Sequence, residues 1–245
     1  MSSMNQLLSQ YLDPLLRGRR KDCRDIVKSA LAEGIAPKHL YHDVLWPAMA
    51  RVDQMYRGDQ INVAAEHMAT RINRTVADHL QTRLDRKPAI NRCILITSAE
   101  GEAEEFSAQM CSDLFEAEGW DVFLVGGGVP QDEIVELVGQ IRPDILLVVG
   151  SRPQDAPGVR ALIEAVHQIN ACPTMNVMVS GGVFNRAGEL WKEVKADLFA
   201  ATAGEALELA LEATPRTPQS IDPNAPKKRR RRRRPALLLA TEGHA

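Results

Sequence analysis

From residue 88 onward, short apolar runs alternate with stretches of helical periodicity, and this alternation restricts the fold more than any other feature of the chain. Consecutive parallel strands need a long crossover, normally a helix, and the resulting sheet is covered on both faces. The alternation therefore predicts an α/β domain with a doubly wound parallel sheet, Rossmann-like or flavodoxin-like, over residues 88–213. The predicted strands are 92–97, 121–125, 144–149, 176–180 and 197–200, and the predicted helices are 103–118, 130–140, 155–169 and 203–212.

The preceding part of the chain has helical periodicity throughout. Apolar residues recur three and four positions apart from Leu7 onward. Gly18 and Gly34 interrupt this pattern, and residues 58–60 interrupt it again, because glycine commonly follows the last residue of a helix. Residues 1–87 are therefore predicted to form a four-helix bundle ahead of the sheet domain.

The last part of the chain, residues 214–245, is polar, rich in proline and strongly basic. Such a segment buries too little apolar surface to offset its ordering entropy, so we expect a disordered tail. Removing its eight consecutive cations from the formal charge of −2 leaves −10 for the rest of the chain. The run could bind nucleic acid or another polyanion without sequence preference, or bind the acidic body of the protein itself. It consists of Lys227, Lys228, Arg229, Arg230, Arg231, Arg232, Arg233 and Arg234.

The chain is 44% apolar and 25% charged, which is typical of a globular protein. No apolar run approaches the roughly 18 to 20 residues that cross a bilayer, and the first residues lack the basic and apolar regions of a signal peptide. The four cysteines are scattered without a Cys-x-x-Cys pair, which favours structural thiols over a metal or redox site. We therefore expect a cytoplasmic protein with no membrane partner.

The junction between the first predicted strand and its helix, residues 101–107, is strongly acidic. In an open α/β sheet this edge holds the ligand. Neither a nucleophile nor a paired cation lies nearby in sequence, so these carboxylates are interpreted as a solvated helix start that is favoured by the helix dipole. The sequence therefore predicts a protein that is not an enzyme.

Several short motifs occur in an order and spacing typical of one family. The bundle contains residues 21–24, the Trp-Pro-Ala-Met sequence 46–49, and Tyr56 followed after nine residues by Glu66-His67. The sheet domain contains the motifs 118–122 and 124–130, and then Ser180-Gly181-Gly182. Together they resemble cobalamin (B12)-binding domains with an N-terminal four-helix bundle, the family of methyltransferase corrinoid proteins and B12 photoreceptor regulators. The resemblance covers roughly residues 20–211.

The resemblance implies a cobalt site at the acidic junction, and the chain departs from it there. The family motif is acid-x-His-x-x-Gly, in which the His binds cobalt. Here Glu102 keeps the acid, Glu104 replaces the His and Ser107 replaces the Gly. A carboxylate is a harder, charged donor than a neutral imidazole, so the lower cobalt ligand is missing. We therefore expect no cofactor, with cobalamin or haem as the alternatives.

The remaining family positions imply the rest of a cofactor site. Gly181 and Gly182 match the glycine pair that leaves room for the cofactor's nucleotide tail, because glycine has no side chain. His67, beside Glu66, matches the histidine that faces the upper side of the corrin, which makes it the candidate metal ligand. Tyr56 replaces a tryptophan that caps the upper axial group.

These observations lead to one main functional hypothesis and two alternatives. The main one is a non-enzymatic regulator, sensor or adaptor on a B12-binding scaffold, acting in transcription control through a protein partner or a second copy of the chain. The first alternative is a cobalamin- or haem-binding sensor that uses His67. The second is the corrinoid carrier subunit of a methyltransferase.

Overall fold

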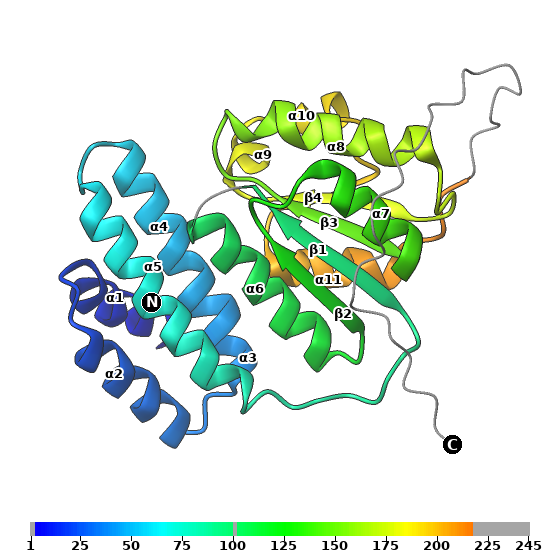
Figure 1. Cartoon of the computed structure of the whole chain (residues 1–245). Helices are drawn as coiled ribbons and strands as arrows, with labels where there is room; N and C mark the ends of the chain where they lie inside the picture. The colour runs from blue at the N-terminus through cyan, green and yellow to red at the C-terminus, as the bar shows by residue number, and fades with distance from the viewer. Residues whose placement is uncertain (1–2, 100–101, 218–245) are drawn as a thin grey trace, which may run out of the picture.

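The computed structural model describes residues 3–99 and 102–217, so the basic run at 227–234 lies outside the described residues. A helical bundle is followed by a parallel sheet flanked by helices (Figure 1). The predicted domain boundary after residue 87 falls in the segment between the last bundle helix and the first strand. None of the helices in the described ranges is long and apolar enough to span a membrane.

The bundle has four helical arms, as predicted. Gly18 and Gly34 end the first two arms with φ of 68° and 87°, a left-handed conformation that glycine adopts readily. Asn62 caps the last arm, because its side chain accepts a hydrogen bond from the N–H of Ala65 at 2.9 Å. The segments are α1 (Ser3–Leu16), α2 (Arg20–Ala32), α3 (Pro37–Leu40), η1 (Tyr41–Leu45), α4 (Trp46–Arg57) and α5 (Val63–Gln81).

The third arm is one continuous helix with a wide π turn in its middle. α3, η1 and α4 follow one another without a break, and η1 has the π geometry. A π turn contains one more residue than an α turn, and such turns often occur at functional sites. Tyr41, at the start of the π turn, is fully buried, whereas Trp46, just after it, lines a cleft.

The sheet has five parallel strands in the order β2-β1-β3-β4-β5, which is the flavodoxin-like order. The prediction of a doubly wound domain is therefore confirmed. Two short helices, α9 and α10, were not predicted. The elements are β1 (Cys93–Ser98), α6 (Glu102–Ala117), β2 (Asp121–Gly126), α7 (Gln131–Ile141), β3 (Ile145–Val149), α8 (Asp155–Ile169), β4 (Asn176–Ser180), α9 (Gly182–Arg186), α10 (Leu190–Glu193), β5 (Leu198–Ala200) and α11 (Ala203–Glu212).

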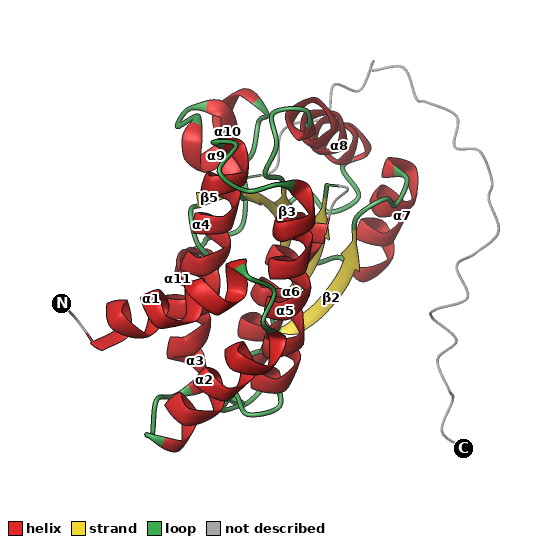
Figure 2. Ribbon diagram, turned by 90° about the vertical axis from the view of Figure 1, so that its left-hand side faces the viewer, coloured by secondary structure: helices red, strands yellow, loops and turns green. Residues whose placement is uncertain are grey.

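Both faces of the sheet are covered, because α6 and α11 lie on one side and α7 and α8 on the other (Figure 2). The central strands β3 and β4 are buried at every residue, as expected of parallel strands covered on both faces. One core cluster includes residues of the bundle, α6, α11 and the adjoining sheet face. The bundle and the sheet domain therefore share a hydrophobic core.

A polar seam along α6 also joins the bundle to the sheet domain. Lys38 binds Glu118 at 2.6 Å, and Gln109 donates to Asp78 at 2.7 Å. Deeper in the seam, the hydroxyl oxygen of the buried Tyr41 lies 2.9 Å from the carbonyl of Ala77 and 2.8 Å from a carboxylate oxygen of Asp113. The pKa of Asp113 is raised to about 7, because burial and the nearby carboxylates of Asp78 and Glu116 outweigh the lowering by the Tyr41 hydrogen bond.

Candidate functional site

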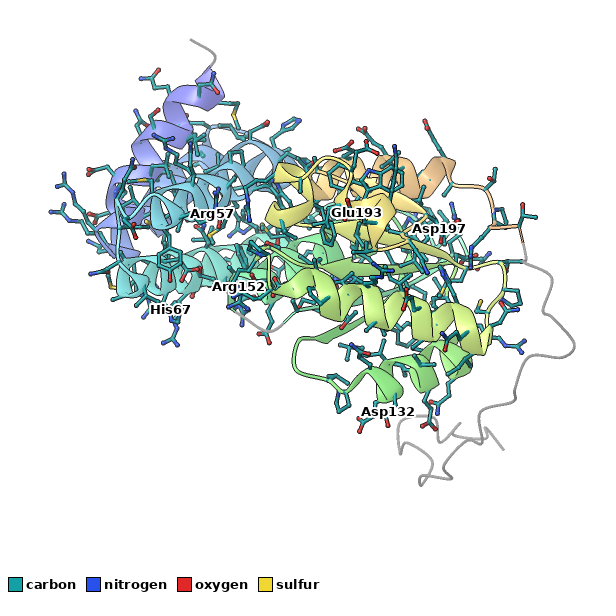
Figure 3. The ribbon with its side chains drawn as sticks, turned by 90° about the horizontal axis from the view of Figure 1, so that it is seen from above. Arg57, His67, Asp132, Arg152, Glu193 and Asp197 are labelled. Carbon is teal, nitrogen blue, oxygen red and sulfur yellow. The ribbon has the colours of Figure 1, made fainter. Side chains whose placement is uncertain are left out.

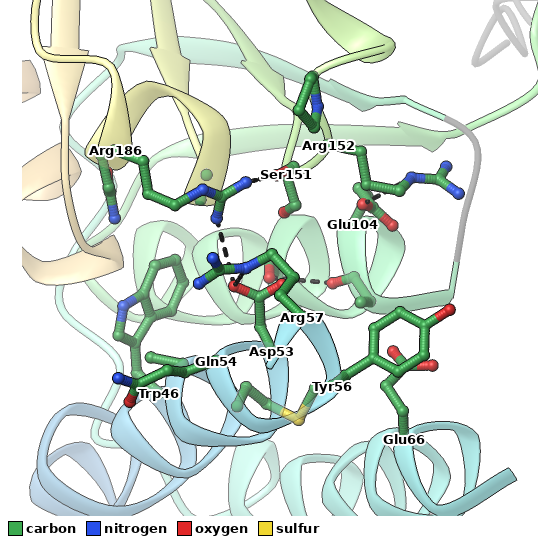
Figure 4. A pocket seen from close by; sticks show the side chains of 18 of the residues that line it. Trp46, Asp53, Gln54, Tyr56, Arg57, Glu66, Glu104, Ser151, Arg152 and Arg186 are labelled. Carbon is green, nitrogen blue, oxygen red and sulfur yellow. Dashed lines mark hydrogen bonds and ion pairs between the residues drawn. The ribbon is translucent and has the colours of Figure 1, made fainter. Parts of the chain in front are cut away.

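A cleft opens between the helical bundle and the carboxyl edge of the sheet. Its volume is about 710 Å³, toward the upper end of the range for small-molecule sites. α4 and α5 form one wall, and the first turns of α6 with the loops after β3 and β4 form the other (Figure 4). Ligands of open α/β sheets bind at this edge, where the strand order changes direction between β1 and β3.

The cleft brings together most of the residues that the sequence predicted for the site. Glu102 is the first residue of α6, and its side chain lies outside the described part of the chain. The side chains of Arg57, His67 and Arg152 lie around the junction of bundle and sheet domain, far from Asp132 and Asp197 (Figure 3). The predicted residues in the lining are Tyr56, Glu66, His67, Glu104, Ser107, Gly181 and Gly182.

Glu104, at the position of the family's cobalt-binding histidine, is buried in the wall of the cleft. Its side chain is 4% exposed, and its Oε1 lies 3.4 Å from Nε of Arg152 in the loop after β3. Burial raises the pKa of Glu104; Arg152 opposes this rise, while Asp155 and Glu66 add to it. The prediction of a solvated acidic helix start is therefore wrong for Glu104, because α6 turns this residue toward the protein.

The loop after β3 holds Arg152 against Glu104. Asp155, the first residue of α8, accepts hydrogen bonds on Oδ2 from the backbone N–H groups of Ser151 and Arg152, at 3.0 and 2.8 Å. Its other carboxylate oxygen lies 3.8 Å from Nε of Arg152. The guanidinium therefore stands between two carboxylates. An ion pair thus occupies the part of the cleft wall where the family has its cobalt-binding histidine.

His67 lies near the mouth of the cleft, on α5. Its side chain is 48% exposed, and Nε2 lies 3.5 Å from Oε2 of Glu66, which is largely buried. Tyr56 on α4 is also exposed. Within residues 3–99 and 102–217 no group of three or more histidine, cysteine, aspartate or glutamate side chains is arranged to hold a metal ion. His67 is the one imidazole in the cleft lining that the structure describes.

The space beside the two predicted glycines is filled by the protein itself. Gly181 has a φ of 110°, and a Cβ on it would lie 2.3 Å from the carbonyl oxygen of Gly150. A Cβ on Gly182 would lie 2.6 Å from Nη1 of Arg186. Gly181 thus lets the loops after β3 and β4 pack closely, and Gly182 admits the arginine side chain; their role toward a cofactor tail stays a prediction.

Sequence reasoning missed a set of charged residues that crosses the cleft. Asp53 on α4 accepts a hydrogen bond from Nε of Arg57 at 3.0 Å and pairs with Nη1 of Arg186 at 3.3 Å. Nη2 of Arg186 donates to the carbonyl of Ser151 at 2.6 Å (Figure 4). No local signal marks Arg186, because it ends a helix of five residues that carries no periodic pattern.

Within residues 3–99 and 102–217, two buried serine hydroxyls at this edge of the sheet have no hydrogen-bond partner. Ser98 ends β1 and Ser180 ends β4, and both are level with Val149 of β3, which lies between them. A buried polar group without a partner costs about 1–3 kcal/mol, but neither serine belongs to the described lining of the cleft. The volume of the cleft fits a ring-sized ligand, whereas the carboxylate of Glu104 does not fit the role of a nitrogen ligand.

The sheet, the bundle over its carboxyl edge and the cleft between them define a class of two-part ligand-binding protein. A family model described as B12 binding domain matches residues 7–81, and a second model with the same description matches residues 92–211. The chain therefore belongs to the B12-binding domain family.

Its relatives include corrinoid proteins of Methanosarcina. Dimethylamine corrinoid protein 3 of Methanosarcina acetivorans is 23% identical over 218 residues, which cover 86% of this chain and 99% of that protein. Monomethylamine corrinoid protein 1 of the same organism is 22% identical over 77% of this chain and 88% of its own length. The solved structure of the Methanosarcina barkeri monomethylamine corrinoid protein has the same fold, with a TM-score of 0.72 and 19% identity over 85% of this chain and 98% of that one.

These comparisons overturn the prediction that no cofactor is bound. The prediction depended on the loss of one axial ligand at Glu104, whereas both halves of the chain match B12-binding domains. A ring-sized ligand contacts many residues of a cleft, so the loss of one ligand does not remove the site. The comparisons also favour the corrinoid-carrier alternative over the regulatory hypothesis, because the relatives are named as corrinoid proteins.

Proposed function

We propose that this protein binds a corrinoid in the cleft and presents it to a methyltransferase partner. The observation that carries the proposal is the cleft of about 710 Å³ between two parts that both match B12-binding domains. The names of the methylamine corrinoid relatives support the carrier role, since this chain spans nearly their whole length. In this role the protein is a carrier, and the partner is the catalyst.

The walls of the cleft would hold the ring from two sides. Trp46 and Met49 of α4 offer apolar surface, and the polar side chains around Gly181 and Gly182 face the ring's polar periphery. A bound corrinoid supplies a cobalt centre that can carry a methyl group. The protein's own contribution is to orient the ring, to exclude water from one face and to leave the mouth near Tyr56 open for a partner.

We further propose that the sheet domain supplies no nitrogen ligand to this corrinoid. Glu104 stands where the family places its imidazole, and its carboxylate is paired with Arg152 at 3.4 Å. A buried charge of this kind is stabilised by its partner, so we expect the ion pair to stay intact when a ligand occupies the cleft. His67 at the mouth would then be the imidazole of the described lining that is left to approach a bound corrinoid.

Retention of a corrinoid by variants that fill the cleft tests the proposal. Purified protein is mixed with hydroxocobalamin or with haemin and then desalted, and the absorption spectrum is recorded. Wild type should retain the corrinoid. Ala50→Trp places a bulky side chain from an exposed position into the cleft lining and should abolish retention. Arg51→Trp is the matched control, because Arg51 is also exposed on α4 but is not part of the lining.

Two results would contradict the proposal. A colourless wild-type protein after desalting would mean that the cleft does not bind a corrinoid. Equal retention by Ala50→Trp and wild type would place the ligand elsewhere on the protein. Retention of haemin in preference to the corrinoid would favour the haem-binding alternative that uses His67.

Binding of the basic run at 227–234 to nucleic acid stays a prediction, since that segment lies outside the described residues.

A further inference from the structure

An ion pair between Asp53 and Arg186 links the two walls of the cleft directly. Asp53 belongs to α4 of the bundle and Arg186 to α9 of the sheet domain, and Oδ2 of the first lies 3.3 Å from Nη1 of the second. The two side chains are 34% and 31% exposed, so water screens them only in part. Both residues line the cleft, and Figure 4 shows the pair crossing it. A ring-sized ligand that fills the cleft therefore comes up against this contact.

The same pair is tied to its surroundings on both sides. On the bundle side, Oδ2 of Asp53 also accepts a hydrogen bond from Arg57, one helical turn later. On the sheet side, Nη2 of Arg186 donates to the carbonyl of Ser151 in the loop after β3. The carboxylate thus holds two guanidinium groups close together, and its removal would leave two like charges facing each other across the cleft.

The other polar contacts between bundle and sheet domain described above lie along α6. They include the Lys38–Glu118 ion pair and the buried contact of Tyr41 with Asp113. The shared hydrophobic core lies on this side as well. The bundle is therefore anchored along α6, while the Asp53–Arg186 pair ties it to the loops after β3 and β4, across the cleft.

We propose that the Asp53–Arg186 ion pair is a clasp that sets the width of the cleft and has to open before a ring-sized ligand enters. The proposal rests on the function proposed above, because it concerns access to the same site. Gly182 is part of the device, since a side chain at this position would collide with the guanidinium. A partly exposed ion pair is weak enough to open thermally, so ligand access is slowed but not prevented.

Two variants separate the parts of the clasp. Asp53→Asn removes the link to the bundle and leaves the hydrogen bond from Arg186 to Ser151 in place. Arg186→Gln removes both the ion pair with Asp53 and the hydrogen bond to Ser151. Each should raise the association rate of hydroxocobalamin, followed by stopped-flow absorbance, about fivefold, the factor that an ion pair of this exposure represents. Arg160→Gln is the control, because it breaks the Arg160–Glu164 pair on α8, outside the cleft lining.

A distance measurement on ligand-free protein tests the clasp independently of any corrinoid. Spin labels attached through genetically encoded handles at Arg51 of α4 and at Glu189, just before α10, report the separation of the two walls. The distance distribution should broaden toward longer values in Asp53→Asn and stay unchanged in Arg160→Gln. An unchanged distribution together with an unchanged association rate would overturn the clasp. Failure of wild type to bind any corrinoid would instead count against the proposed function. The spin-label distances in ligand-free protein would still test the clasp in that case.

Discussion

The buried contact between Tyr41 and Asp113 predicts a specific dependence of stability on pH. The Tyr41 hydroxyl has one proton, yet its oxygen lies within hydrogen-bond distance of two acceptors, the Ala77 carbonyl and Asp113. A protonated Asp113 resolves this shortage, because its own hydroxyl can donate to Tyr41 while Tyr41 donates to Ala77. The pKa of Asp113 is raised from 3.8 to about 7, mainly by burial and although the hydrogen bond with Tyr41 lowers it.

The sign and size of the effect follow from linkage. Between pH 3.8 and about 7 the folded state binds the proton of Asp113 and the unfolded state does not, so stability falls as pH rises through this interval. At about 1.4 kcal/mol per pH unit, the interval amounts to about 4 kcal/mol. This contribution is fully present below pH 3.8 and is lost above the folded-state pKa.

Asp113→Asn tests this reasoning, because an amide imitates the protonated acid in shape and can also donate to Tyr41. Urea unfolding followed by circular dichroism between pH 4.5 and 8.5 gives the free energy of unfolding of each protein. The variant should match wild type at the acidic end and exceed it by about 3 kcal/mol at the alkaline end, because only the part of the interval above pH 4.5 is sampled. Asp25→Asn, at an exposed position on α2, is the control. A difference between Asp113→Asn and wild type that does not change with pH would refute the argument.

Two further predictions concern the site. Glu104→His should add a nitrogen ligand, seen as nitrogen hyperfine splitting in the electron paramagnetic resonance spectrum of bound Co(II) cobinamide, a corrinoid without its own base. Wild type should lack this splitting, and a splitting in wild type that survives His67→Ala would contradict the reading of Glu104. Gly181→Ala should destabilise the protein by about 3 kcal/mol, measured by urea unfolding, because of its φ of 110° and the nearby Gly150 carbonyl. Gly188→Ala, with no atom within 4 Å of the added carbon, should be nearly neutral, and equal losses would refute the packing argument.

The order and type of the long elements could be predicted from the sequence, because each carries a periodic pattern that its own packing requires. The strand Asn176–Ser180 and the helix Asp155–Ile169 were predicted with the bounds that the structure gives. The short helices Gly182–Arg186 and Leu190–Glu193 were missed, since a helix of four or five residues is too short to show a repeat. The π turn was missed because a single extra residue leaves no mark on the apolar spacing.

The candidate site could be predicted in position but not in its electrostatics. Strand-to-helix junctions identify the ligand edge of a parallel sheet, and the predicted Glu104, Gly181 and Gly182 do line the cleft there. The partners of these residues come from distant parts of the chain. Arg152 pairs with Glu104, and Arg186 with Asp53, across separations that no local pattern encodes. The inference of no cofactor failed for the same reason, because it treated one position as if it were the whole site.

The π turn at Tyr41–Leu45 determines which face of α4 is turned toward the cleft. Successive residues of an α-helix are rotated by about 100° around its axis. Deleting one residue here would restore ordinary winding and swing Trp46 and Asp53 away from the cavity while Tyr41 stayed in the core. A substitution in this helix changes one side chain of the cleft wall. The insertion or deletion of one residue in the turn would instead rotate every α4 side chain that lines the cleft.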